Sequence, residues 1–148
     1  MQPLDPHTLF SIFEKGDEEV YQEHGIEDTL KNPYVLMGMV LEGIQNYHIM
    51  DMMYMNRYPD KYTNVRSITK AKFYAKLYGY LTRIDSTNFD QAYTIGESFE
   101  YTNVYKGLDE LRVFFQAVEQ YEKCAIVKNY QDLLIDATIS TIKLSNLV

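Results

Sequence analysis

The sequence predicts an all-α protein, a compact bundle of four to five helices that ends in a helical hairpin. Apolar residues recur at helical spacing in several segments of the 148-residue chain, which is the pattern of one buried helix face. The strict alternation of a half-buried strand is nowhere sustained. An Asx residue followed by proline, a signal for the start of a helix, precedes two of these segments.

A short first helix is expected near the N-terminus, where Asp5 can act as the cap and Pro6 suits the first helical position. Gly16 is suited to end it, and the acidic residues 17–24 can form a second short helix or turn. The apolar side of the first helix consists of Leu9, Phe10, Ile12 and Phe13.

The next helix is predicted from Asn32-Pro33 to about Asn56, because Tyr58-Pro59-Asp60 should break it. One face combines Leu36, Val40, Ile44, Tyr47, Met50 and Tyr54. The six internal methionines lie between Met37 and Met55 and spread apolar surface around much of the remainder. A helix that is apolar on most sides is either central in a bundle or covered by a partner.

A further helix is predicted from about Ser67 to Ile84. Its core stripe consists of Phe73, Leu77, Leu81 and Ile84. Lys72, Lys76 and Arg83 gather on a neighbouring stripe beside Tyr80. The helix is therefore expected to have a basic edge with an aromatic border.

Residues 85–104 are expected to form a long connection that can hold one short helix around Ala92 and Ile95, although Gly96 weakens that prediction. A helical hairpin should follow. Its first helix has the stripe Leu108, Leu111, Phe114 or Phe115, and Val118. The stripe of its second helix is Tyr121, Ala125, Val127 or Lys128, Leu133 or Leu134, and Ile135.

Residues 108–135, and Gln120 to Ala125 above all, resemble the UVR helical hairpin of excision-repair subunits. In that hairpin an acidic-aromatic-Glu turn leads into a pair of small residues; downstream, Val127-Lys128-Asn129 departs from the usual Leu-Arg-Asp. The resemblance implies a tight hairpin with Cys124 and Ala125 at the helix contact. It also implies docking onto another hairpin.

The length predicts a single helical domain over residues 1–148, with a frayed tail at 145–148. The one cysteine, Cys124, cannot form a disulfide within the chain, which favours a reducing compartment. Residues 1–30 lack the pattern of a secretory signal, and the most apolar run, 34–40, is too short to cross a bilayer. A cytoplasmic protein without membrane contact is expected.

No motif predicts catalysis or a cofactor. A di-iron bundle needs Glu-x-x-His on two helices, whereas the nearest matches here are Gln45-x-x-His48 and the pair His48 and Asp51. Cys124 lies in mid-helix, without the neighbouring histidine or helix N-terminus that activates a thiol. Phosphate-binding loops, nucleophile elbows and Cys-x-x-Cys are also lacking. We therefore expect no metal, no cofactor and no enzyme, with a cryptic site assembled from distant residues as an alternative.

Charge is strongly segregated along the chain. Residues 57–83 carry a formal charge of +6, residues 1–56 carry −8 and residues 84–148 carry −5. Lysines and arginines interleaved with tyrosines suit phosphates and unpaired bases, which favours a nucleic-acid or nucleotide partner. The same cations can instead meet carboxylates of this chain or of a second subunit. We favour the second interpretation, and the first stays as the alternative.

The predicted function is a small non-catalytic interaction protein that docks a protein partner or associates with itself. Methionine is overused on surfaces that adapt to apolar partners. The chain is short, lacks Trp and is rich in Tyr and Met, which also resembles the composition of small accessory or inhibitor proteins of phages and mobile elements. The predicted partner-binding residues are Met37, Met52, Met53, Met55, Lys72, Lys76, Tyr80 and Arg83.

Overall fold

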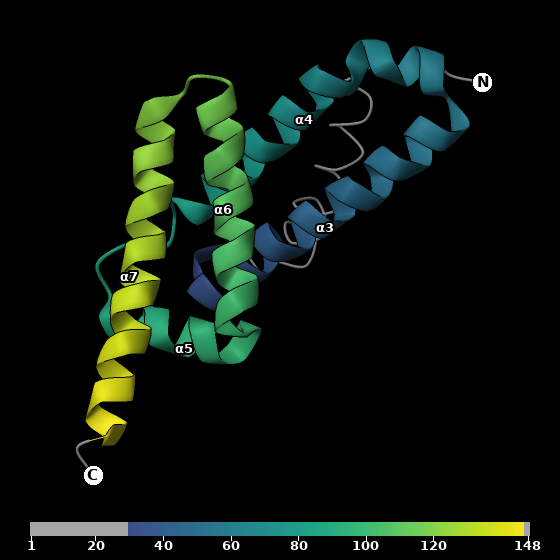
Figure 1. Ribbon diagram of the computed structural model, residues 1–148. Helices are drawn as coiled ribbons and strands as arrows, with labels where there is room; N and C mark the ends of the chain where they lie inside the picture. Colours follow the sequence, from purple (N-terminus) through teal and green to yellow (C-terminus); the bar gives the residue numbers. More distant parts are fainter. Residues whose placement is uncertain (1–29, 147–148) are drawn as a thin grey trace. The chain divides into compact units, whose positions relative to one another are not determined.

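The computed structural model describes residues 30–146, and within this range it contains five helices and no strand (Figure 1). The all-α class and the C-terminal hairpin are thus confirmed. The helices expected near Asp5 and over residues 17–24 lie outside the described residues. The five helices are α3 (Pro33–Arg57), α4 (Pro59–Leu81), α5 (Phe89–Phe99), α6 (Tyr101–Ala117) and α7 (Tyr121–Asn146).

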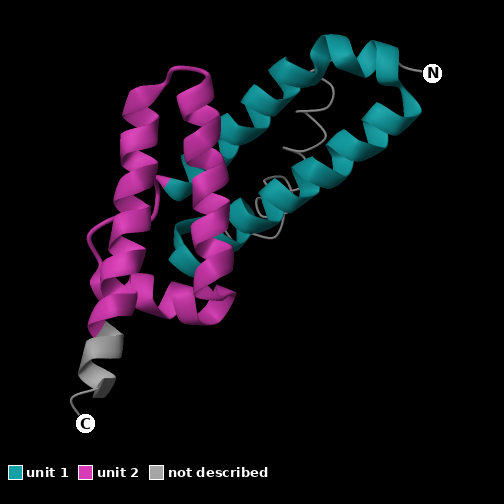
Figure 2. Cartoon of the chain, in the orientation of Figure 1, with its two compact units in different colours: residues 1–81 teal, residues 82–148 magenta. Residues whose placement is uncertain are grey.

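The chain divides into two compact units between Leu81 and Thr82 (Figure 2). In the first unit α3 packs against α4, and in the second α5, α6 and α7 pack against one another. The single domain predicted over residues 1–148 stays a prediction. The tail expected to fray at 145–148 is helical as far as Asn146, and residues 147–148 are outside the described part.

Helix α3 begins where the sequence predicts. The side-chain oxygen of Asn32 accepts hydrogen bonds from the backbone N–H groups of Tyr34 (2.9 Å) and Val35 (3.4 Å). Pro33 occupies the first turn, where its missing N–H costs nothing. The buried face of α3 runs from Leu36 to Tyr47. Met50 and Tyr54 were also predicted for that face, but they are half-buried.

Helix α4 begins at Pro59, eight residues before the start that the sequence predicted at Ser67. The same proline that ends α3 is the first residue of α4, because the fixed φ of proline suits the N-terminal turn of a helix. Asp60 in the first turn adds a favourable interaction with the helix dipole. The helix also stops at Leu81, three residues before the predicted Ile84.

Small and aromatic residues bring α3 and α4 together. A Cβ added at Gly43 would collide with the side chain of Leu77, so glycine at this position permits the close approach of the two helices. The ring of Tyr47 lies 5.6 Å from that of Phe73 and 5.3 Å from that of Tyr74, between ring centroids. These edge-on and tilted contacts build the aromatic core of the first unit.

The long connection expected at 85–104 contains more helix than the sequence predicted. Asn88 caps α5 by accepting a hydrogen bond from the Gln91 N–H at 3.0 Å, and α5 is separated from α6 by Glu100 alone. Gly96, which weakened the prediction, is buried, and a Cβ at this position would lie 3.2 Å from Leu134 Cδ1. Gly96 is therefore a closely packed, buried position within α5 and does not mark a loop.

The hairpin of α6 and α7 turns through a Schellman motif. The Gln120 N–H donates to the Phe115 carbonyl at 2.8 Å, and the Glu119 N–H donates to the Gln116 carbonyl at 3.1 Å. Glu119 has the left-handed φ of 61° that this motif needs. Val118 and Tyr121 flank the turn and are exposed, so the structure does not place them in the predicted core stripes.

Cys124 lies at the helix contact that the UVR resemblance implied, because its thiol donates to the Arg112 carbonyl at 3.3 Å. Ala125 is exposed, so the second half of that expectation is wrong. Farther along α7, the buried Tyr130 hydroxyl donates to the Ile84 carbonyl at 2.6 Å and anchors the segment before α5. The second unit is thus held by polar as well as apolar contacts.

Candidate functional site

The methionines predicted to bind a partner differ in how far they are buried. Met37 is 3% exposed and belongs to the core, whereas Met52 and Met53 are 59% and 57% exposed. Met55 is half-buried, with its sulfur 4.0 Å from the Thr63 hydroxyl of α4. Met52 and Met53 are therefore the members of the predicted set that a partner can reach most easily.

The predicted basic stripe is not one continuous surface. Lys72 and Lys76 are half-buried on α4, and Tyr80 is 2% exposed. The ammonium group of Lys76 lies 5.8 Å from the centre of the Tyr80 ring, within the range of a cation–π contact. Arg83 follows the end of α4 and belongs to the second unit, so it does not extend the helical stripe.

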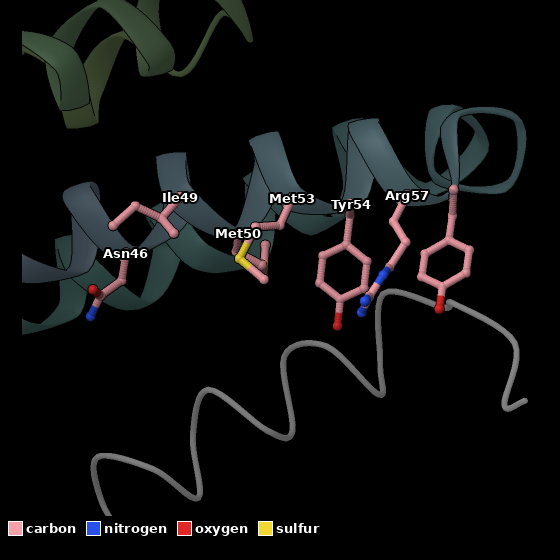
Figure 3. Close-up of a pocket in the computed structure, with 7 residues that line it drawn as sticks. Asn46, Ile49, Met50, Met53, Tyr54 and Arg57 are labelled. Atoms are coloured by element: carbon pink, nitrogen blue, oxygen red, sulfur yellow. The ribbon is translucent and has the colours of Figure 1, made fainter.

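A first pocket, of about 370 Å³, lies along α3 (Figure 3). Its side chains recur at spacings of three and four residues, which places them on one side of the helix. Met50 and Tyr54 are half-buried within it, whereas Ile49 is 53% exposed. The lining residues are Asn46, Ile49, Met50, Met53, Tyr54, Arg57 and Tyr58.

A second pocket, of about 380 Å³, is shared by α3 and α4. It is more polar than the first. Its lining residues are Tyr47, His48 and Asp51 from α3, and Arg66, Ser67 and Lys70 from α4.

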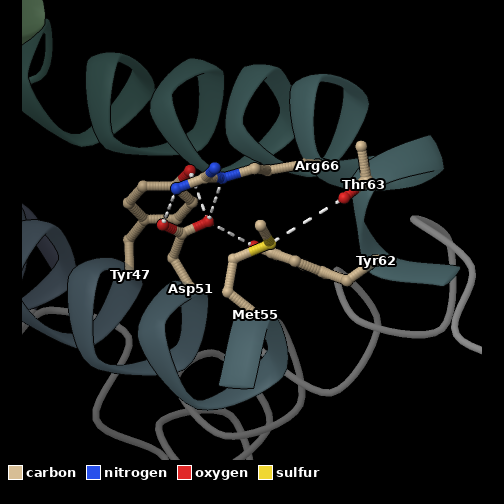
Figure 4. Close-up of polar contacts among 6 residues, drawn as sticks. All are labelled: Tyr47, Asp51, Met55, Tyr62, Thr63 and Arg66. Carbon is tan, nitrogen blue, oxygen red and sulfur yellow. Dashed lines mark hydrogen bonds and ion pairs between the residues drawn. The ribbon is translucent and has the colours of Figure 1, made fainter. Parts of the chain in front are cut away.

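Asp51 is the centre of a hydrogen-bonded cluster in this second pocket (Figure 4). Arg66 donates from Nε to Asp51 Oδ1 at 2.9 Å and from Nη2 to Oδ2 at 2.7 Å. The Tyr62 hydroxyl donates to Oδ1 at 2.7 Å, and the Tyr47 hydroxyl donates to the same oxygen at 3.4 Å. A carboxylate whose side chain is only 14% exposed is thus satisfied from both helices.

These contacts change the acidity of the groups involved. The hydrogen bonds from Arg66 hold the pKa of the Asp51 carboxyl below its usual range, although burial opposes the shift. Burial, assisted by the charge of Asp51, raises the pKa of Tyr47 to about 12. Burial and the hydrogen bond to Asp51 also raise the pKa of Tyr62. At neutral pH the tyrosines are therefore protonated donors and Asp51 is an ionised acceptor.

The sequence did not predict the Asp51–Arg66 pair, because Arg66 was expected near a loop. Asp51 lies seven residues before Tyr58 and Arg66 lies seven after Pro59. Two antiparallel helices joined at that point bring such positions together. The missed signal was the proline, which starts α4 as well as ending α3.

The His48 and Asp51 pair considered for metal binding lies in this pocket, where the oxygens of Asp51 already accept from Arg66, Tyr62 and Tyr47. Within the described residues, no three His, Cys, Asp or Glu side chains come together as a metal site would need. None of the helices within residues 30–146 combines the length and apolar character needed to cross a membrane.

Comparisons of the chain with protein-family models, with curated proteins and with solved structures found no match.

Proposed function

We propose that the chain is a non-catalytic protein-binding protein and that the partner on the α3 pocket face is a second copy of the chain. We define the α3 pocket face by Ile49, Met50, Met53, Tyr54 and Arg57. The observation that carries the proposal is that Ile49 and Met53, one helical turn apart, are 53% and 57% exposed and line the same pocket. Apolar side chains at this spacing suit docking of a helix.

Charge complementarity favours a second copy over an unrelated partner. Two copies of α3 packed antiparallel about an axis near Ile49 and Met50 would bring Arg57 of one copy beside Glu42 of the other, because both residues are equally far from that centre. Both side chains are exposed. In the described part of the chain neither forms an ion pair.

Methionine supports this arrangement physically. The side chains of Met50 and Met53 are flexible and polarizable, so they can fill the irregular gaps left where two identical helix faces meet. A two-fold interface would form two Glu42–Arg57 pairs around an apolar centre. This is the usual anatomy of a specific interface, with an apolar core and a polar rim.

Adjacent methionines provide a matched test. Met53→Asp should lower the affinity of self-association by about tenfold or more, because it places a charge at the apolar centre of the interface. Met52→Asp is the control, since Met52 is 59% exposed but does not line the pocket. Light scattering and sedimentation over a range of concentrations measure the association.

A wild-type chain that remains monomeric at high concentration would show that a second copy is not the partner. Equal weakening by Met52→Asp and Met53→Asp would show that the α3 pocket face is not the interface. The broader predictions, namely an accessory or inhibitor role in a phage or mobile element and a cytoplasmic location, stay predictions.

A further inference from the structure

We infer that Met53 is a site of reversible oxidation to methionine sulfoxide by hydroperoxides, and that this modification releases the second copy from the α3 pocket face. This regulation rests on the proposed self-association of the chain. Met53 lines the α3 pocket and is more than half exposed, so an oxidant in solution can reach its sulfur. A thioether that an oxidant can reach is readily converted to the sulfoxide.

The reaction changes one atom of the side chain. The Met53 sulfur donates an electron pair to one oxygen of the hydroperoxide, so the S–O bond forms while the O–O bond breaks. The proton of the attacked oxygen moves to the leaving oxygen, which departs as water or an alcohol. The sulfur is oxidised by two electrons and the peroxide is reduced by two. Methionine sulfoxide reductases reverse the change with a dithiol, which becomes a disulfide as water is released.

The methionines of α3 differ in how easily an oxidant can reach them. Met37 is buried in the core, and Met55 is half-buried with its sulfur in contact with a hydroxyl of α4. Met50 lies in the same pocket as Met53 but is half-buried. Among the methionines of the described residues, Met52 alone matches Met53 in exposure, and it does not line the pocket. Oxidation should therefore begin at Met52 and Met53, and of these two only Met53 lies on the α3 pocket face.

A sulfoxide at Met53 opposes self-association in two ways. It is polar, so burying it at the apolar centre of the interface without a hydrogen-bond donor costs free energy. Its oxygen is also an acceptor, and Arg57 lies one helical turn after Met53 on the same side of α3 (Figure 3). A hydrogen bond from Arg57 to the sulfoxide diverts the guanidinium from Glu42 of the second copy.

Met52 and Met53 form a matched pair for the test, because they are similarly exposed and only Met53 lines the pocket. The full-length wild-type protein, Met52→Leu and Met53→Leu are treated with hydrogen peroxide, and each is compared with its own untreated form by sedimentation. Leucine is apolar and close to methionine in volume, but it has no sulfur to oxidise. We expect oxidation to weaken self-association about tenfold in the wild type and in Met52→Leu, but less than about twofold in Met53→Leu. Cys124 is present in all three proteins, so its oxidation cannot explain a difference between them.

Peptide mass spectrometry measures the oxidation of each methionine in the same samples. In dilute, monomeric protein, Met52 and Met53 should be oxidised at similar rates and the buried Met37 about tenfold more slowly. At concentrations at which the chains associate, Met53 should be protected about fivefold relative to Met52, because the interface covers it. Methionine sulfoxide reductases with dithiothreitol should restore association of the oxidised wild type.

Association that survives complete oxidation of Met53 would overturn the inference. Equal sensitivity of Met53→Leu and the wild type would also overturn it, because the effect would then belong to another residue. Oxidation of Met37 as fast as that of Met53, or association that the reductases do not restore, would do the same. A wild-type chain that is monomeric before oxidation would instead refute the proposed self-association, and the regulation with it. The untreated protein decides that question and the oxidised protein decides the other, so the two failures are distinguishable.

Discussion

At the scale of single residues, Asp51 is the group that links the two helices of the first unit most specifically. It accepts hydrogen bonds from one residue of its own helix and from two residues of α4. A carboxylate in this position is stabilising only while it is ionised. Its stability contribution must therefore depend on pH.

Asp51→Asn tests that dependence. The folded-state pKa of Asp51 is lowered, so its contribution is fully present above the ordinary carboxyl pKa and is lost as the pH falls through the folded value. We expect the substitution to lower the free energy of unfolding by about 1–2 kcal/mol at pH 7 and by less at pH 3. Urea unfolding at both pH values measures the difference.

The control for this experiment is Asp132→Asn, which changes an exposed carboxylate of α7 that has no hydrogen bond or ion pair within the described residues. Its effect should be small at both pH values. Equal losses for Asp51→Asn at pH 7 and pH 3 would contradict the role of the ionised carboxylate. Asp109 and Asp85 also have lowered pKa values, so the wild-type protein should still lose some stability in acid.

Gly43 and Gly79 offer a second residue-scale test, because both are helical glycines with different surroundings. A Cβ at Gly43 would collide with Leu77, whereas a Cβ at Gly79 would meet nothing within 4 Å. Gly43→Ala should destabilise by about 1–3 kcal/mol through overpacking. Gly79→Ala should stabilise by about 0.5–1 kcal/mol through helix propensity.

Thermal or urea unfolding of the two alanine variants gives both values directly. Leu77→Val in the Gly43→Ala background should recover part of the loss by making room for the added methyl group. A stabilising Gly43→Ala would contradict the close approach of α3 and α4.

At the scale of elements, the turn between α6 and α7 carries a residue that is poorly suited to its backbone. Glu119 has a φ of 61° at the position that glycine occupies in most Schellman motifs. An L residue with a side chain is strained there.

Glu119→Gly should therefore raise the free energy of unfolding by about 0.5–1 kcal/mol, because glycine adopts this conformation without a steric cost. Glu119→Ala is the matched control, since it removes the same charge but keeps the Cβ. Calorimetric melting compares the two. An equal gain in both variants would show that removal of the charge, and not relief of the backbone, is responsible.

Elements were predictable where their boundaries depend on local chemistry. Asn32 and Pro33 predict the start of α3, and the structure shows Asn32 as the helix cap. Pro59 was correctly predicted to break α3, but its second role as the first residue of α4 was missed. A proline that ends one helix and begins the next looks the same in the sequence as a proline in a loop.

The candidate sites were less predictable than the elements. Methionines were correctly located on α3, but helical periodicity did not distinguish the buried Met37 from the exposed Met52 and Met53. The helix is apolar around much of its circumference, and burial is decided by the elements that cover it. Asp51 and Arg66 are 15 residues apart in the sequence, and their pairing depends on the register between two helices. The periodicity of a single helix does not predict that register.

At the scale of the whole molecule, the proposed self-association places Arg57 of one copy beside Glu42 of the other. Arg57→Glu would place like charges opposite Glu42 in both halves of the proposed two-fold interface. The free energy of dimerisation should weaken by about 1–2 kcal/mol, with two pairs affected at once. Glu42→Arg alone should have the same effect for the same reason.

The double variant Arg57→Glu with Glu42→Arg exchanges the two charges and should restore association to near the wild-type value. Sedimentation equilibrium of the four proteins at low salt measures this cycle, and the differences should shrink at high salt. Failure of the double variant to recover would contradict the antiparallel arrangement of α3.

The sequence by itself determined the all-α class, the start of α3, the C-terminal hairpin and the location of the basic segment. These features follow from capping, turn chemistry, helical periodicity and charge, which act over a few neighbouring residues. Only the tertiary structure decided that Arg66 binds Asp51, that Arg83 lies outside α4 and that Met53 lines an exposed pocket. Those outcomes depend on which helix faces meet and in what register, and that choice is made by packing between segments far apart in the chain.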